Sequence, residues 1–134
     1  MRNGAGERTT RSEKYGSRVD DLNLFGRLMG VVAVNEKDVK LVKSGHGETK
    51  WLVPSKNGTS PEMMIRHWGP DTDIPVHSHP YHEMFYVLEG EIEIGGVTYA
   101  AGSCIYIERG TPYGPTRAPK GGKVLRYAEA GPSK

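Results

Sequence analysis

The sequence has a single cysteine, no long apolar run and no sustained helical period. Cys104 has no partner for an intrachain disulfide, which is typical of a protein from a reducing compartment. No stretch is apolar and long enough to span a bilayer, and no charged leader followed by an apolar core opens the chain. We therefore expect a cytoplasmic protein with no membrane partner.

An excess of one charge is also missing from most of the chain. Residues 1–20 hold five Arg or Lys against three acidic residues, which accounts for the whole formal net charge of +2. The remaining residues are balanced, whereas a nucleic-acid-binding domain usually has a basic face, so we expect no nucleic-acid partner. Residues 1–20 are polar and nearly free of apolar side chains. We predict a disordered basic arm there, with a phosphate-binding arm as the alternative.

Glycine and proline, by contrast, are abundant, with 18 and 9 residues. This composition suits short strands joined by turns. Gly95-Gly96, between two alternating runs, is typical of a two-residue hairpin turn. The pattern predicts one all-β domain over residues 21–134, an antiparallel barrel or double-sheet sandwich that encloses one ligand cavity. Apolar or alternating runs predict strands at 28–34, 39–43, 50–53, 62–68, 85–88, 91–94, 97–100, 103–107 and 123–128.

Three of the five histidines lie within residues 77–82, where one of these strands begins. His77 and His79 are two positions apart, so on an extended segment both side chains leave the same face, and Glu83 shares their parity. His82 has the opposite parity and is expected to point away. Two imidazoles and one carboxylate suit Fe, Mn, Ni, Zn or Cu, and their softness does not choose among these metals. We predict a metal site, with a surface loop of histidines as the alternative.

The stretch from Gly69 to Gly90 resembles the first motif of the cupin superfamily, a glycine, then H-x-H, then a glutamate, then a second glycine. Seven residues separate Gly69 from His77, where the family usually has five. The segment 102–113 resembles the second motif, with Glu108 at the usual proline position and Tyr113 at the usual histidine position.

This resemblance implies a jelly-roll-like antiparallel β-barrel in which the two motifs face each other across one metal ion. In the family, three histidines and one glutamate bind that ion. Carried over residue by residue, His77, His79 and Glu83 match three ligands, and the fourth position is Tyr113. The implied cofactor is one divalent transition metal (Fe, Mn, Zn or Ni).

Tyr113 therefore decides most of the expected chemistry. It could bind the metal as a phenolate, act as a hydrogen-bond or acid/base partner, or simply line the cavity. A free tyrosine has a pKa of about 10, so ionisation at neutral pH needs a nearby cation. A neutral Tyr113 leaves two histidines and one carboxylate with open positions, the set of non-haem iron oxygenases.

Four further side chains are candidates for catalysis or substrate binding. His67, on the strand before the first motif, is a candidate catalytic base, with a hydrogen-bonded core histidine as the alternative. Arg66, Arg109 and Arg126 could clamp a substrate carboxylate in bidentate geometry, although arginines on strands more often lie at the surface.

We expect a metal-dependent enzyme that acts on a small oxygenated metabolite, with dioxygenase chemistry favoured. The alternatives are a Lewis-acid isomerase, lyase or dehydratase, and a cupin that binds a small ligand without turning it over. We also predict a homodimer, because small cupins commonly pair and the apolar run 28–34 is a candidate for edge pairing.

Overall fold

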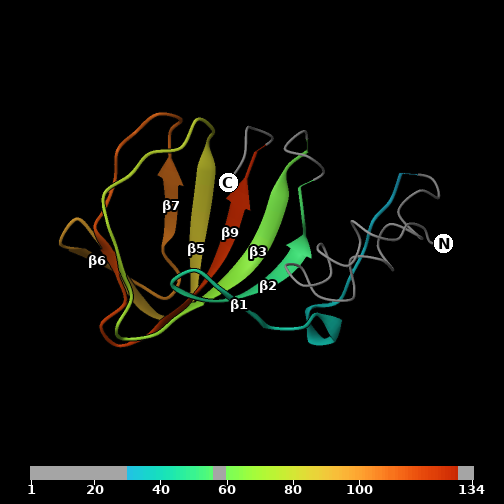
Figure 1. The fold of residues 1–134 in the computed structure, drawn as a ribbon, viewed down its shortest axis with the longest axis horizontal. Helices are drawn as coiled ribbons and strands as arrows, with labels where there is room; N and C mark the ends of the chain where they lie inside the picture. Colours follow the sequence, from blue (N-terminus) through green and yellow to red (C-terminus); the bar gives the residue numbers. More distant parts are fainter. Residues whose placement is uncertain (1–29, 56–59, 130–134) are drawn as a thin grey trace.

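Nine short strands and one turn of 3-10 helix make up the regular structure of residues 30–55 and 60–129, the part of the chain that this computed structural model describes (Figure 1). The predicted arm 1–20 lies outside it. No helix in the described part is long and apolar enough to cross a bilayer. The elements are η1 (Glu36–Asp38), β1 (Val42–Ser44), β2 (Gly47–Val53), β3 (Glu62–Trp68), β4 (Asp73–Ile74), β5 (Glu83–Ile94), β6 (Val97–Ala100), β7 (Cys104–Ile107), β8 (Thr116–Arg117) and β9 (Gly122–Ala128).

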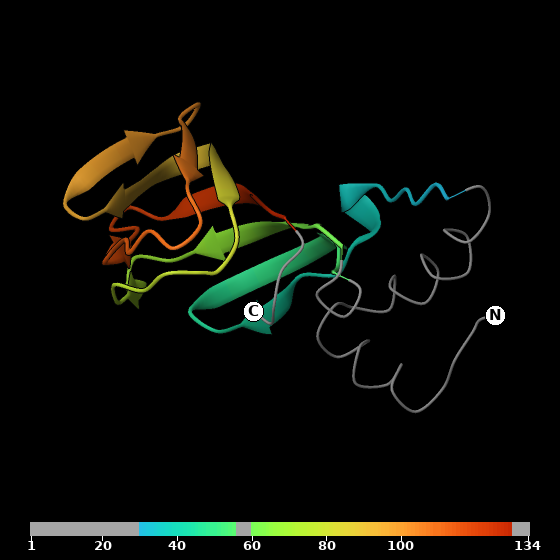
Figure 2. The ribbon, with the colours of Figure 1, turned by 90° about the horizontal axis from the view of Figure 1, so that it is seen from above.

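Strand β5 belongs to both layers of the fold. Its first part pairs with β9 on one side and with β7 on the other, and its last four residues pair with β6. Glu93 and Ile94 also pair with β8, which in turn pairs with β4. One layer is therefore β1, β2, β3, β9, β5 and β7, and the other is β4, β8, β6 and the end of β5 (Figure 2). All these pairs are antiparallel, which confirms the predicted all-β antiparallel fold.

The change of layer occurs at Gly90. Its φ of 68° lies in the left-handed region, and a Cβ at this position would collide with the carbonyl oxygen of Gly121. The register against β9 shifts between Val87 and Glu89, and such a bulge bends a strand. The glycine that closes the first motif is thus required by the corner between the two layers.

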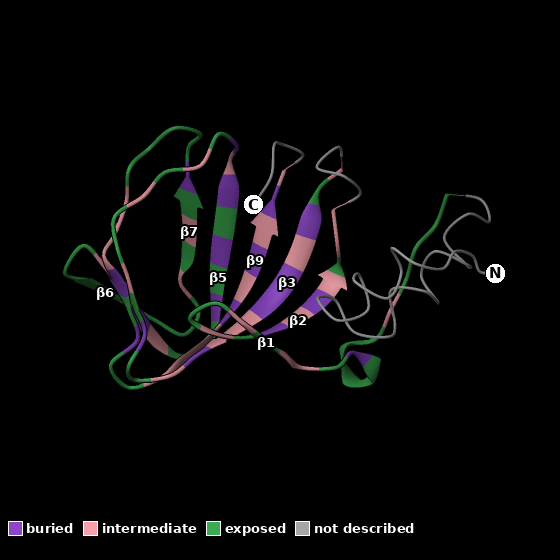
Figure 3. Ribbon diagram, viewed as in Figure 1, coloured by how far each residue is buried: buried purple, intermediate pink, exposed green. Residues whose placement is uncertain are grey.

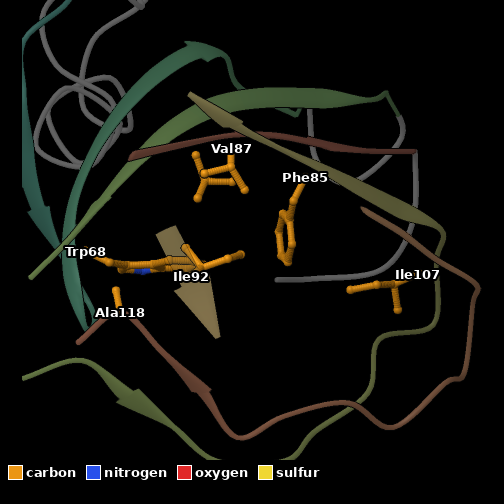
Figure 4. Packing of buried hydrophobic residues seen from close by; sticks show 7 residues of the cluster. Trp68, Phe85, Val87, Ile92, Ile107 and Ala118 are labelled. Carbon is orange, nitrogen blue, oxygen red and sulfur yellow. The ribbon is translucent and has the colours of Figure 1, made fainter. Parts of the chain in front are cut away.

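Alternation along β5 decides which side chains face the interior. Glu83, Phe85 and Val87 are buried, whereas Met84 and the other even-numbered side chains near it are exposed (Figure 3). The parity predicted for the strand after the histidines is therefore confirmed. The core formed between the layers (Figure 4) consists of Trp68, Phe85, Val87, Ile92, Ile107, Ala118 and Val124.

Most predicted strands are confirmed, with two corrections. Strands 62–68 and 97–100 have the predicted bounds, and the runs 85–88 and 91–94 are one continuous strand, β5. The Gly95-Gly96 hairpin is confirmed, with φ values of 59° and 86°. The strand predicted at 28–34 is wrong where it is described, because residues 30–34 pair with no strand and Val31 is 63% exposed. The strand predicted at 39–43 begins later, at Val42, after η1.

Candidate active site

A cavity of about 300 Å³ lies between the two layers. The inner face of β2, β3, β9 and β5 forms one wall, and β4, β8 and the segments before β5 and β8 form the other. His77, His79 and Tyr113 of the two motifs line it, whereas Glu83, His67 and His82 are not among its lining residues. Its lining residues are Ser44, His46, Trp51, Glu62, Met64, Arg66, Trp68, Ile74, His77, His79, Tyr81, Phe85, Tyr113, Thr116 and Arg126.

His77 and His79 turn their outer ring nitrogens toward each other. The two Nε2 atoms are 3.1 Å apart, and the ring planes cross at 84°. Two ligands bound at right angles, each about 2.1 Å from one metal ion, would be about 3.0 Å apart. The two imidazoles therefore have the spacing that neighbouring ligands of one ion need.

The inner ring nitrogens hold the two imidazoles in place. His77 Nδ1 lies 2.8 Å from the carbonyl oxygen of Pro75, which can only accept, so this nitrogen donates and His77 Nε2 keeps its lone pair. His79 Nδ1 lies 3.0 Å from the Tyr81 hydroxyl, and the Tyr81 ring stacks on His79 at 4.9 Å. Such partners fix the orientation of a metal-ligating histidine. Tyr81 was missed in the sequence, although it shares the parity of His77, His79 and Glu83.

The backbone brings the second motif to the first. His77 and Tyr113 form an isolated antiparallel bridge, with N–H to oxygen distances of 3.1 and 2.9 Å. The amide of Gly110 donates to the carbonyl oxygen of His79 at 2.8 Å. The Tyr113 ring consequently lies 4.8 Å from the His77 ring, at the place where the second motif puts its histidine.

Glu83, at the start of β5, is divided between two environments. Its Oε2 accepts from Arg126 Nε at 2.7 Å and lies 2.6 Å from Arg126 Nη2. Its Oε1 is buried, makes no hydrogen bond of ordinary geometry within the described residues, and lies 3.9 Å from His79 Nε2. One carboxylate oxygen is thus committed to an ion pair, and the other is a buried acceptor beside the histidines.

Residues 64–125 match the family model described as Cupin domain. These residues form a cupin domain. An RmlC-like cupin from Shewanella frigidimarina has a TM-score of 0.63 at 18% identity, over 73% of this chain and 89% of that one. The polyketide cyclase RemF from Streptomyces resistomycificus has a TM-score of 0.63 at 22% identity, over 75% and 80% of the two chains. The Fe(II) form of HppE has a TM-score of 0.62 at 19% identity, over 75% and 61%. These identities show a shared fold alone, and no curated protein matches the chain.

In this cupin, Arg126 is committed to the protein's own carboxylates and is not the substrate clamp considered from the sequence. It pairs with Glu83 and, through Nη1 at 3.2 Å, with Glu62, and it donates to the Tyr81 hydroxyl at 3.2 Å. Burial acts to lower the pKa of Arg126, but Glu83 and Tyr81 outweigh it, so the pKa is raised. Both carboxylates and the guanidinium are buried, which makes the cluster a fixed part of the cavity wall.

Tyr113 is a neutral phenol in these surroundings. Burial raises its pKa above the ordinary value of a tyrosine, and the negative charge of Glu83 raises it further. Ionisation would need a cation close to the hydroxyl, as a phenolate ligand has. The surrounding protein therefore favours Tyr113 as a neutral hydrogen-bond donor beside the histidine pair.

His67 does not join the cupin cavity. Met64, Arg66 and Trp68 of β3 line it, so His67 lies on the opposite face of that strand. Burial lowers the pKa of His67, and the nearby Lys123 and Lys50 lower it further. The structure thus separates this sequence-based candidate from Tyr113 and the histidine pair.

His82 also lies outside the cavity, as its parity predicts. Its Nδ1 accepts from the Arg109 amide at 2.9 Å and lies 3.0 Å from the Tyr106 hydroxyl. Arg109, in turn, pairs with Glu129 at 2.6 Å. His46, by contrast, is exposed but contributes to the cavity lining, a position that its glycine-rich loop did not reveal.

Proposed function

We propose that this cupin is a metal-dependent enzyme that acts on a small oxygenated metabolite in the cavity between its two layers. The observation that carries the proposal is the approach of His77 Nε2 and His79 Nε2 to 3.1 Å, with each Nδ1 held by another group. Among the described residues, no three His, Cys, Asp or Glu side chains are already close enough to hold an ion. Two of the three predicted metal ligands, His77 and His79, already have a suitable spacing. The third, Glu83, has its Oε1 atom 3.9 Å from His79 Nε2.

The residues present fit a metal ion. His77 Nε2, which faces His79 Nε2 at 3.1 Å, can offer a lone pair, and Glu83 Oε1 is buried with no donor at ordinary hydrogen-bond geometry in the described part. A buried polar atom left unsatisfied costs about 1–3 kcal/mol, which a coordinated cation would offset. His77, His79 and Glu83 are therefore the residues that would hold a divalent transition metal. When bound, the metal would supply Lewis acidity or, as iron, a centre for dioxygen chemistry.

The chain's own side chains supply the remaining parts of the chemistry. Phe85 and Ile74 contribute apolar surface to the cavity, against which the carbon skeleton of a metabolite would pack and exclude water. The set of two histidines and one carboxylate leaves positions open for substrate, and this supports dioxygenase-type oxidoreduction as the favoured reaction. The ligand set, rather than the likeness to HppE, is the basis for that choice.

One observation favours a second candidate function. The Tyr113 hydroxyl stays protonated because burial and Glu83 raise its pKa, so it can donate a hydrogen bond to a substrate oxygen at neutral pH. Such a donor beside a Lewis-acid centre would stabilise the oxyanion that forms in isomerase, lyase or dehydratase chemistry.

The test is the metal content of protein purified without added metal, measured by elemental analysis. We expect about one transition-metal ion per chain in the wild type, and loss of it in His77→Ala and His79→Ala. His82→Ala is the matched control, because His82 belongs to the same segment but lies outside the cavity. Iron or manganese would support oxygen chemistry, and zinc or nickel would support Lewis-acid chemistry. A wild type that holds none of these, even after loading, is a binding protein and not the enzyme proposed.

A further inference from the structure

Arg66 contributes a positive charge to the cavity wall without a carboxylate partner. Its Nε atom is buried and has no hydrogen-bond partner among the described residues. The other arginines of the described part each pair with an acidic side chain: Arg109 with Glu129, Arg117 with Asp73, and Arg126 with Glu62 and Glu83. Arg66 instead lies over the Trp68 ring, with its guanidinium carbon 5.5 Å from the ring centre.

The charges around Arg66 do not compensate for this. Burial lowers the pKa of Arg66, and the positive charge of Arg126 lowers it further. Glu62, which lines the cavity, and the buried Glu83 both pair with Arg126 instead. Buried charges in proteins are normally paired, because leaving one unpaired is costly. Arg66 is therefore the one guanidinium of the described part without an acidic partner of its own.

Two more hydrogen-bond donors in the same cavity lack acceptors. Trp68 Nε1, which can only donate, and Thr116 Oγ1 are buried without a partner in the described part, and both residues line the cavity. Nearly all buried polar groups in folded proteins are satisfied. With Arg66 Nε, they form a set of donors for which residues 30–55 and 60–129 supply no acceptor.

We propose that Arg66 binds a carboxylate of the substrate, so that the metabolite is a small organic monoacid. This inference rests on the proposed function for the assignment of the cavity as the substrate site. A guanidinium fork matches the two oxygens of one carboxylate in bidentate geometry. A cavity of about 300 Å³ limits the acid to a small one.

The experiment compares acids with their neutral amides. The protein as purified is titrated with benzoate and benzamide, with acetate and acetamide, and with inorganic phosphate, and binding is followed by calorimetry. We expect at least one acid to bind the wild type about tenfold or more tightly than its amide and more tightly than phosphate, because a charge-assisted hydrogen bond is lost in the amide.

The Arg66→Gln variant should lose that preference, so that acid and amide bind alike, whereas Arg66→Lys should keep part of it. Arg109→Gln is the control, because it removes a guanidinium that pairs with Glu129 and lies outside the cavity. If neither acid is preferred by the wild type, or if Arg66→Gln keeps the preference, the inference is overturned. Tighter binding of phosphate than of either acid would overturn it too.

Metal content, measured in the same preparations, separates this inference from the proposed function. Arg66→Gln should hold as much metal as the wild type, because Arg66 is on β3 and the predicted ligands are on another segment. A wild type that prefers acids but holds no metal would support Arg66 as the carboxylate site and contradict the proposed metal-dependent enzyme. A metal-loaded wild type without acid preference would support the proposed enzyme and overturn the inference on Arg66.

Discussion

Glu62 of β3 and Glu83 of β5 both lie opposite Ala128 of β9, and one guanidinium joins them. Arg126 stands two residues before Ala128 on the same face of β9, and diagonal neighbours at that offset are within reach of long side chains. The small Ala128 side chain leaves room for the guanidinium between the two acids. Three strands of one layer are thereby tied together beneath the predicted metal site.

Loss of Arg126 should therefore be among the most damaging single changes. Arg126→Met leaves two buried carboxylates without a counter-charge, and we expect the free energy of unfolding to fall by about 3–5 kcal/mol. Urea unfolding followed by circular dichroism measures this. Arg117→Met is the control, because its partner Asp73 is exposed, and exposed pairs contribute about 1 kcal/mol or less. Similar losses in both variants would show that burial of the Arg126 cluster matters little.

Replacing Tyr113 separates its possible roles. Because Tyr113 is a neutral phenol, Tyr113→Phe should leave the metal content nearly unchanged. Tyr113→His restores the fourth ligand type of the family and should tighten metal binding by about tenfold or more, one extra ligand replacing water. Competition with a chelator measures both affinities. A large loss of metal in Tyr113→Phe would instead identify the phenolate as a ligand.

Tyr81 should tune the metal affinity without being a ligand. Its hydroxyl holds His79 Nδ1 at 3.0 Å, and removal of such a partner typically lowers metal affinity about 10- to 100-fold. Tyr81→Phe should show a loss in that range in the same chelator assay, with the ion still bound at high metal concentration. Tyr106→Phe is matched to it, because the Tyr106 hydroxyl contacts His82 instead. Equal effects of the two changes would exclude a specific role for Tyr81.

His67 should make stability depend on pH between neutral and mildly acidic conditions. Its pKa is lower in the folded state than in the unfolded state, so the unfolded chain binds more protons and stability falls as the pH drops below the unfolded pKa of about 6.5. His67→Asn removes this group, and its melting temperature should decrease less than that of the wild type between pH 7 and pH 5. Parallel decreases in both proteins would contradict the lowered pKa.

Self-association remains a prediction. The best candidate for the interface is the outer face of the layer that contains β1, β2, β3, β9, β5 and β7. Met84, Tyr86 and Leu88 of β5 and Tyr106 of β7 are exposed there, and Met84 lies directly opposite Tyr106. We expect a dimer mass by light scattering at micromolar concentration, and a monomer mass for Met84→Lys. Val97→Lys, an equally polar change of an exposed apolar residue on β6, should leave the dimer intact. A monomeric wild type would rule the dimer out.

The sequence could predict features that repeat along one strand. Parity placed Glu83, Phe85 and Val87 inside and His82 outside, because neighbouring positions of a strand alternate between faces. It could not orient β3, because EMMIRHW has apolar residues at both parities, and His67 was therefore considered for the wrong face. The partnership of Arg126 with Glu62 and Glu83 depends on the register of three strands, which no local pattern contains.

Strand propensity was also insufficient for the segment 30–34. Its valines favour extended backbone, but a strand is stabilised only by a neighbouring ladder, and none lies beside it in the described part. The two-residue strands β4 and β8 were missed for the opposite reason. Their extended conformation comes from pairing with each other and with β5, and two residues are too few to show a period.

The bend of β5 at Gly90 also determines how a small molecule can reach the cavity. One continuous strand, β5, runs through both layers. The layers therefore cannot separate without breaking the hydrogen bonds that pair β5 with β6 and β9. A small molecule must then enter and leave at the edge of the cavity, where Ser44 and the exposed His46 of the turn between β1 and β2 contribute to the lining. The β1–β2 hairpin is joined to the sheet only through β2. Local opening of this hairpin should therefore set the residence time of a bound small molecule, while β5 keeps the two layers in place.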